Sequence, residues 1–93
     1  MSYRVELRPT ADREYARLAP DARAAVLTLP HGLGIEPRRR GVAAVRGRPG
    51  VLRARVGDYR VLFKVDDGQG LVSVGRIALR GRVYKRLGDV RFD

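Results

Sequence analysis

The stretch VLRARVGDYRVLFKV, residues 51–65, alternates apolar and polar side chains on both sides of a Gly-Asp pair. Successive side chains of a strand point to opposite faces of a sheet, and a Gly-Asp pair suits a tight two-residue turn. The stretch therefore predicts an antiparallel hairpin that turns at Gly57 and Asp58. Counting outward from this turn fixes the register. The expected pairs are Val56 with Tyr59, Arg55 with Arg60, Ala54 with Val61, Arg53 with Leu62 and Leu52 with Phe63.

The register predicts one apolar and one basic face for this hairpin. The core face is expected to hold Leu52, Ala54, Val56, Tyr59, Val61, Phe63 and Val65. The opposite face is expected to hold Val51, Arg53, Arg55, Arg60, Leu62 and Lys64. On it Arg55 and Arg60 lie directly opposite each other, where like charges repel. An anionic partner would explain their presence, because guanidinium groups bind phosphates through paired hydrogen bonds.

Basic residues outnumber acidic ones and concentrate in the middle of the chain. The 93 residues suit a single domain, residues 1–93, with one modest core. Lys and Arg total 20 against 10 Asp and Glu, giving a formal net charge of +10. The segment from Arg38 to Lys64 holds much of the excess, with Asp58 as its one acid. This balance favours nucleic acid, an acidic protein or an anionic surface as the partner.

The composition disfavours several chemistries and locations. The sequence has no cysteine, which excludes disulfides and thiolate metal sites, and no metal or cofactor is expected. The lone His31 lies in a Pro/Gly-rich segment and Asp66 and Asp67 in an expected turn, so none of them is expected to be catalytic. Neither a signal peptide nor an apolar run of about 18 residues occurs, so a soluble, cytoplasmic protein without a membrane partner is expected.

The N-terminal part of the chain predicts a strand followed by a helical hairpin. Residues 3–8 alternate in the manner of a strand. Thr10 is expected to cap a first helix, and Pro20 to lie in the first turn of a second. Pro30 should end or kink that second helix, and residues 31–41, rich in glycine and proline, are expected to form a loop.

The C-terminal part predicts a third strand from Leu71 to Leu79, with Gly75 as a candidate β-bulge. Arg76 and Arg80 are four residues apart and share a face if no bulge intervenes, and Tyr84 follows them. Several arginines and a tyrosine on one sheet face are suited to gripping a phosphodiester. For Tyr84, core packing with a solvent-exposed hydroxyl is an equal alternative.

The element order and several residues resemble the RelE/ParE superfamily of toxins from bacterial and archaeal toxin–antitoxin modules. The resemblance runs from Tyr3 to about Leu87. It includes ADREYARLAPDARAAVL as the helical hairpin, PRRRGV as the connection, LRARVGDYRVLFKVDD as the most diagnostic hairpin and RIALRGRVYKRL in the tail. It implies an α+β fold in which two N-terminal helices pack on a small antiparallel sheet. It also implies an acidic cognate antitoxin that wraps the toxin in a hetero-oligomer.

The resemblance further implies a reaction. Ribonuclease members cut mRNA in the ribosomal A site without a metal: the 2′-hydroxyl attacks the adjacent phosphate and leaves a 2′,3′-cyclic phosphate. Position matching implies Arg60, Arg80 and Tyr84 as catalytic residues, with Arg53 as a basic strand residue beside them. Arg53 and Arg60 would clamp phosphate, Arg80 would stabilise developing charge, and Tyr84 would transfer a proton or orient a nucleotide. The expected substrate-binding residues on the basic face are Arg53, Arg55, Lys64 and Arg76.

Three positions depart from the ribonuclease pattern. Val51 stands where some members have Lys, Leu79 replaces the common His or Lys, and Gly81 loosens what is often a helix start. These departures leave two alternatives open. One is a ParE-like inhibitor of DNA gyrase, and the other is a catalytically weak module that binds an antitoxin.

Overall fold

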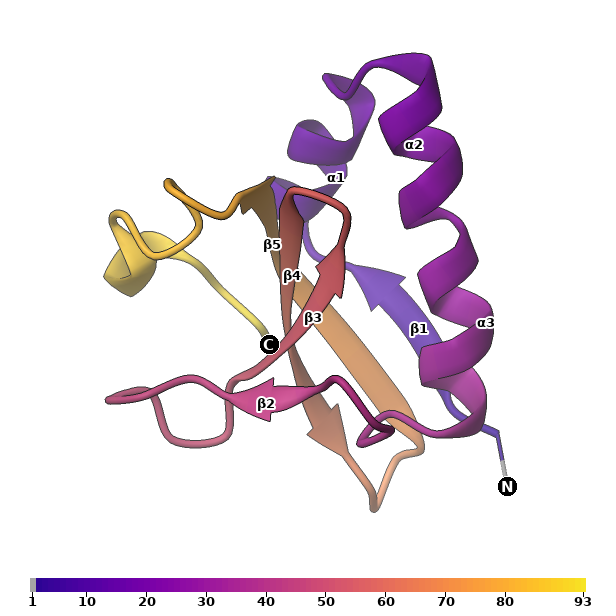
Figure 1. Cartoon of the computed structure of the whole chain (residues 1–93). Helices are drawn as coiled ribbons and strands as arrows, with labels where there is room; N and C mark the ends of the chain where they lie inside the picture. Colours follow the sequence, from indigo (N-terminus) through magenta and orange to yellow (C-terminus); the bar gives the residue numbers. More distant parts are fainter. Residues whose placement is uncertain (1) are drawn as a thin grey trace.

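A computed structural model describes residues 2–93, with the side chain of His31 outside the described part. The elements, in chain order, are β1 (Arg4–Leu7), α1 (Pro9–Ala16), α2 (Pro20–Val26), α3 (Thr28–Ile35), β2 (Ala43–Ala44), β3 (Leu52–Val56), β4 (Tyr59–Asp66), β5 (Leu71–Leu79) and the short 3-10 helix η1 (Leu87–Asp89). The helices lie on one side of the sheet and the C-terminal tail on the other (Figure 1). The predicted α+β class is confirmed.

The central hairpin has the register that its alternation predicts. β3 pairs antiparallel with β4, and all five expected pairs are present, from Leu52 opposite Phe63 to Val56 opposite Tyr59. Gly57 lies at the turn with φ of +57°, a left-handed conformation that glycine adopts without a steric penalty. The turn residue therefore fixes the pairing, and with it the face on which every arginine of the hairpin lies.

The five strands form one sheet in the order β1-β5-β4-β3-β2. β3, β4 and β5 form an antiparallel meander, as predicted, whereas β1 joins the far side of β5 in parallel. The register between β4 and β5 shifts after Leu62, which pairs with Arg76, while Phe63 pairs with Val74. Gly75 is the extra residue between these pairs, so the predicted bulge is confirmed.

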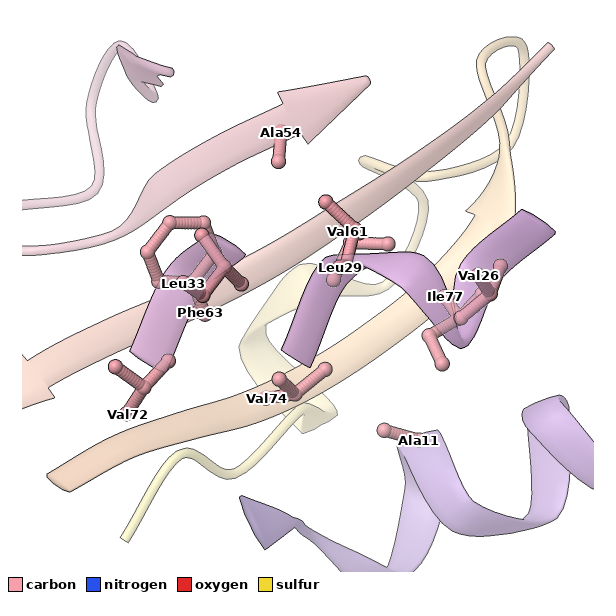
Figure 2. Close-up of a cluster of buried hydrophobic side chains, with 10 residues drawn as sticks. All are labelled: Ala11, Val26, Leu29, Leu33, Ala54, Val61, Phe63, Val72, Val74 and Ile77. Carbon is pink, nitrogen blue, oxygen red and sulfur yellow. The ribbon is translucent and has the colours of Figure 1, made fainter. Parts of the chain in front are cut away.

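The main core lies between the sheet and the helices. Ala54, Val61 and Phe63 of the hairpin are buried against Leu29 and Leu33 of α3 (Figure 2). Phe63 is completely buried, and the other residues of the expected core face pack around the same cluster. Burying large apolar side chains is the dominant favourable term in folding. This face of the hairpin is therefore fixed as the inside of the protein.

The expected loop over residues 31–41 is partly wrong, because α3 continues to Ile35. Pro30 is the third residue of α3, in the first turn, where a missing backbone N–H costs no helical hydrogen bond. Leu27, which separates α2 from α3, has nearly helical dihedral angles (φ −63°, ψ −17°). The two helices consequently run almost end to end (Figure 1).

The start of α1 also differs from expectation. Thr10 was expected to cap the helix, but Arg8 is the N-cap residue and Pro9 occupies the first helical position. Proline is favoured there because its fixed φ matches the helix and its missing N–H would have no partner. Pro20 begins α2 in the same way, which confirms that prediction. No helix among residues 2–93 has the length and apolar character needed to span a bilayer.

A second, smaller cluster forms on the opposite face of the sheet, where the C-terminal tail folds back. Val83, Leu87 and Val90 of the tail pack on Leu62 and Val51, which the alternation had assigned to the polar face. The helical turn predicted around residues 83–87 corresponds to a series of turns followed by η1. The tail covers part of the basic face and leaves the remainder accessible.

Gly75 lets the end of the tail approach the sheet. A Cβ atom at this position would lie 2.6 Å from the Phe92 ring and 2.9 Å from the carbonyl oxygen of Arg91. Gly75→Ala is therefore expected to lower the free energy of unfolding by about 1–3 kcal/mol, as overpacking does, and to expose residues 90–92 to hydrogen exchange. Gly81→Ala is the matched control, because its Cβ would meet nothing within 4 Å. Equal stability of the two variants in urea would contradict this packing.

Asp67, in the turn between β4 and β5, joins three segments that are distant in the sequence. Arg38 donates two hydrogen bonds to its carboxylate, at 3.0 and 2.9 Å, and Tyr3 donates a third at 2.6 Å. The neighbouring Asp66 instead accepts a bond from the backbone N–H of Gln69 at 3.0 Å, the local turn contact expected of this pair. Asp67 thus links the residue before β1, the segment after α3 and the turn between β4 and β5.

These contacts give stability a dependence on acid pH. The hydrogen bonds from Arg38, and then from Tyr3, lower the pKa of the Asp67 carboxyl. Because the folded pKa is the lower one, the stabilisation is present above the unfolded pKa of about 3.9 and is lost as pH falls through the folded pKa. The stability gap between wild type and Asp67→Asn, measured by urea unfolding, should therefore narrow below about pH 4. A gap that stays constant through the acid range would contradict the assignment.

Candidate functional site: a basic face with a tyrosine

The sheet register arranges the arginines in rows. Arg55 of β3 lies opposite Arg60 of β4, and Arg60 lies opposite Ala78 of β5. The next row holds Arg53, Leu62 and Arg76. Side chains two residues apart along a strand are separated by about 7 Å, roughly the spacing of neighbouring nucleic-acid phosphates along a strand. Arg53 and Arg55, two residues apart on β3, therefore present positive charge at an interval suited to a polyanion.

A pocket of about 470 Å³ brings two of the predicted residues together. Arg53 of β3 and Tyr84 of the tail both line it, although they are far apart in the sequence. Arg46 and Arg48, from the segment between β2 and β3, line the same pocket, as does Leu87. Tyr84 is 45% exposed and lines the pocket, so it is accessible to a ligand there. Three arginines beside one tyrosine make this pocket suited to a phosphate and an adjacent base.

Arg46 and Arg48 were not among the predicted site residues. Their segment is held by three backbone hydrogen bonds: Val45 N–H to Val51 O at 2.9 Å, Arg48 N–H to Val45 O at 3.2 Å, and Val51 N–H to Arg48 O at 3.1 Å. Gly47 and Gly50 adopt positive φ within it. The signal available in the sequence was the Arg-Gly-Arg-Pro-Gly spacing, in which turn residues separate two arginines just before a strand.

Arg60 and Arg80 both form hydrogen bonds with the turn between β3 and β4. The Nη1 atom of Arg60 donates to the carbonyl oxygens of Gly57 at 3.0 Å and Tyr59 at 2.9 Å. The backbone N–H of Arg80 donates to the carbonyl oxygen of Asp58 at 3.0 Å, which places the residue directly beyond β5 on the same turn. Arg60 is half-buried and fixed, whereas the Arg80 side chain is exposed.

The remaining predicted substrate-binding residues lie apart from the pocket. Arg55 is exposed beside Arg60. Lys64 is exposed too, but its Nζ atom lies 5.7 Å from the centre of the Phe92 ring, at a separate cleft of about 1090 Å³. That cleft has mixed charge, because Asp66, Asp67, Asp89 and Asp93 line it together with Arg8, Lys64 and Arg91. Arg76 is largely enclosed, with 12% of its side chain exposed.

The three departures from the ribonuclease pattern occupy different environments. Val51 is 4% exposed and packs in the second cluster beneath the tail. Leu79 is 44% exposed at the end of β5, beside the turn that carries Arg80. Gly81 lies in the following turn, with open space around it. Among the described residues, no three His, Asp or Glu side chains gather in a group that could hold a metal ion.

Comparison with known proteins identifies the family to which this arrangement belongs. The family model of the ParE toxin of the type II toxin–antitoxin system parDE matches residues 5–84, a span that runs from within β1 to Tyr84. The chain belongs to the RelE/ParE superfamily of type II toxins. Toxin RelG of Mycobacterium tuberculosis (strain ATCC 25618 / H37Rv) is 37% identical over 87 residues, covering 92% of this chain and 100% of RelG. Toxin RelE of the same strain is 36% identical over 84 residues, covering 89% and 87%.

Solved structures show that the toxin fold extends over almost the whole chain. A chain of the toxin–antitoxin complex RelBE2 from Mycobacterium tuberculosis is 34% identical and superposes with a TM-score of 0.75, covering 86% of this toxin and 100% of that chain. A chain of the archaeal RelE–RelB complex from Pyrococcus horikoshii OT3 gives a TM-score of 0.75 at 27% identity, with coverage of 89% and 100%. The fold and family expected from the sequence are therefore confirmed.

Proposed function

We propose that this toxin cleaves mRNA on the ribosome, without a metal, and that a cognate acidic antitoxin restrains it in the cytoplasm. The pocket shared by Arg53 and Tyr84, flanked by Arg46 and Arg48, supports the proposal most strongly. A basic pocket with an accessible aromatic ring can hold a phosphate and stack a base at the same time. Membership of a superfamily that includes toxins named RelE and RelG supports the same reaction class.

The proposed reaction is transesterification within the RNA strand. The ribose 2′-oxygen loses its proton and bonds to the adjacent phosphorus, and the bond from phosphorus to the 5′-oxygen of the next nucleotide breaks. The products are a 2′,3′-cyclic phosphate and a 5′-hydroxyl, whose oxygen takes up a proton. Tyr84 is the candidate to relay a proton or to hold the base in line. Stabilisation of the negative charge that accumulates on the phosphate is the other requirement.

The arginines are proposed to provide that charge stabilisation. Arg80 is suited to the developing charge because its side chain is exposed while its backbone is hydrogen-bonded to the turn between β3 and β4. It is a poor acid, since a guanidinium keeps its proton below a pH of about 12. Arg53 and Arg60 are assigned to the phosphates of the ground state, and Arg46 and Arg48 extend this contact along the strand. The latter pair supplies positive charge close to Val51, where some ribonuclease members have Lys.

The antitoxin part of the proposal has a direct test in cells. A net charge of +10 on a small domain favours an acidic partner, and opposite charge accelerates association. Induction of the toxin alone should arrest growth, and co-expression of the acidic protein encoded beside it should restore growth. The two proteins should then purify together and separate more readily at high salt. A neighbouring product that neither binds nor relieves the arrest would contradict the proposal.

A ParE-like action on DNA gyrase is the alternative, because the family model that matches residues 5–84 is that of ParE. Leu79 also stands where ribonuclease members often have a His or Lys that could assist proton transfer. A catalytically weak module that holds an antitoxin on its basic face is the third possibility. Assays of mRNA cleavage and of gyrase supercoiling distinguish the three functions. A ribonuclease cuts mRNA, a ParE-like toxin inhibits supercoiling, and a catalytically weak antitoxin-binding module does neither.

A further inference from the structure

Arg76 lies in the middle of a chain of contacts that runs from α1 to the tail segment carrying Tyr84. Glu14 of α1 accepts a hydrogen bond from the backbone N–H of Ile77 at 2.8 Å through Oε1. Its other oxygen, Oε2, lies 3.6 Å from the Nε atom of Arg76. The Nη1 atom of Arg76 then donates to the carbonyl oxygen of Val83 at 3.1 Å and to that of Lys85. One guanidinium thus joins a helix, a strand and the tail.

The burial of these groups shows why Arg76 is unsuited to bind a substrate. Its side chain is 12% exposed and that of Glu14 25% exposed. A charge this enclosed requires compensating partners, and the Glu14 carboxylate supplies the opposite charge. The two protons on Nη1 have two acceptors, the Val83 and Lys85 carbonyls. The contacts of Arg76 are therefore made within the protein, and Arg76 does not line the pocket that holds Arg53.

The two carbonyl oxygens that Arg76 contacts lie on either side of Tyr84. Val83 is completely buried, while Tyr84 projects into the pocket with 45% of its surface exposed. Arg86, the next residue after Lys85, has φ of +51°, a left-handed conformation that a non-glycine residue keeps where its surroundings impose it. The bond from Arg76 to the Lys85 carbonyl is one such constraint. Arg76 consequently fixes the path of the chain through Tyr84.

We propose that Arg76 and Glu14 are positioning residues that hold Tyr84 for the cleavage reaction. The expected effect on cleavage rests on the proposed ribonuclease function. The expected effect on the position of Tyr84 rests on the contacts alone. Arg76 acts through the backbone of Tyr84, and Glu14 acts through Arg76. A tyrosine on an otherwise irregular tail needs such support, because small misplacements of a reacting group reduce rate steeply.

The kinetic test is a double-mutant cycle in single-turnover cleavage of mRNA on programmed ribosomes. Arg76→Gln is expected to lower the plateau rate about tenfold without changing the half-saturating toxin concentration. In the Tyr84→Phe background the same substitution should cause little further loss, because both changes disable one group. Arg76→Lys should recover part of the rate, and Glu14→Gln should lose less than Arg76→Gln because its amide oxygen still accepts from Ile77. Arg17→Gln removes an exposed charge near the end of α1 and is the control.

Three results would overturn the inference. One is wild-type activity of Arg76→Gln; another is a loss that appears as weaker binding to the programmed ribosome; the third is a loss that adds in full to that of Tyr84→Phe. Weaker binding, or a loss that adds in full to that of Tyr84→Phe, would mean that Arg76 acts on the substrate independently of Tyr84. Should Arg76→Gln fail to fold, Arg76→Lys and Glu14→Gln, each combined with Tyr84→Phe, complete the same cycle.

A spectroscopic measurement keeps this inference separate from the proposed function. In toxin carrying ring-labelled tyrosine, the Tyr84 signal is identified by its loss in Tyr84→Phe. Arg76→Gln should shift or broaden that signal and the amide signals of residues 83–86, while Arg17→Gln leaves them unchanged. If the wild type cleaves no mRNA, the ribonuclease proposal fails while this structural result stands. Unperturbed signals in Arg76→Gln would refute the positioning role whatever the activity.

Discussion

Replacing Arg80 with alanine is expected to lower the rate of mRNA cleavage at least about a hundredfold, the usual loss when a preorganised contact to transition-state charge is removed. The fold should survive, because substitution of an exposed residue usually changes the free energy of unfolding by less than about 0.5 kcal/mol. Arg80 is exposed and contributes its backbone, not its side chain, to the turn between β3 and β4. Single-turnover cleavage on programmed ribosomes measures the rate. Thermal unfolding and antitoxin binding show whether the fold is intact.

Arg60 and the pair Arg46 and Arg48 make this prediction more specific. Arg60→Ala should also lose activity, with a small loss of stability because its guanidinium bonds two turn carbonyls. The double variant Arg46→Ala/Arg48→Ala should instead raise the half-saturating toxin concentration, since these residues are assigned to ground-state phosphates. If Arg60→Ala and Arg80→Ala both stay fully toxic, the proposed site is wrong. If they unfold, these arginines belong to the structure and not to the chemistry.

Replacing Phe63 with alanine is expected to lower the free energy of unfolding by about 3–5 kcal/mol, the usual cost of truncating a buried aromatic residue. The ring is completely buried between the hairpin and α3 (Figure 2). A small domain has a total stability of only about 5–15 kcal/mol, so the variant should be close to unfolding at 37 °C. Urea unfolding followed by circular dichroism measures the change.

Leu27→Ala is the control for this core prediction. Leu27 is 60% exposed at the junction of α2 and α3, so its truncation should change stability by less than about 0.5 kcal/mol. A Phe63→Ala variant as stable as Leu27→Ala would mean that the helices do not pack on the hairpin as described. Such a result would contradict the assignment of the inner face, from which the place of every arginine follows.

The hairpin could be predicted from the sequence because its information is local. A two-residue turn sets the register of a hairpin, and the two-residue alternation then assigns each side chain to a face. Every pair from Leu52–Phe63 to Val56–Tyr59 follows from that rule. The bulge at Gly75 could also be predicted from local sequence, because a glycine inside a strand pattern marks a local irregularity.

The segment around Pro30 and the face under the tail depended on context that the sequence pattern does not carry. Proline ends a helix from its interior but not from its first turn, and the position of Pro30 became clear only with the break at Leu27. The alternation assigns Leu62 and Val51 to the polar face of the hairpin, yet the tail buries both. The contact between the tail and the sheet joins distant parts of the chain and has no local signature.

The candidate site was predictable in part for the same physical reason. The face of Arg53 and Arg60 follows from the hairpin register, whereas the pocket around Tyr84 depends on where the tail and the segment before β3 lie. The contacts of Arg76 could not be predicted from the sequence either, because its partners Glu14 and Val83 come from α1 and the tail. A count of arginines on one face cannot distinguish a guanidinium turned toward solvent from one bonded internally.

Mapping mRNA ends after adding the purified toxin to programmed ribosomes, with a gyrase supercoiling assay in parallel, tests the ribonuclease proposal most directly. We predict cuts in phase with the codon in the A site, a 2′,3′-cyclic phosphate on the upstream fragment and unimpaired supercoiling. Arg80→Ala should abolish the cuts while still binding antitoxin. Intact mRNA together with inhibited supercoiling would contradict the ribonuclease proposal and establish the gyrase alternative.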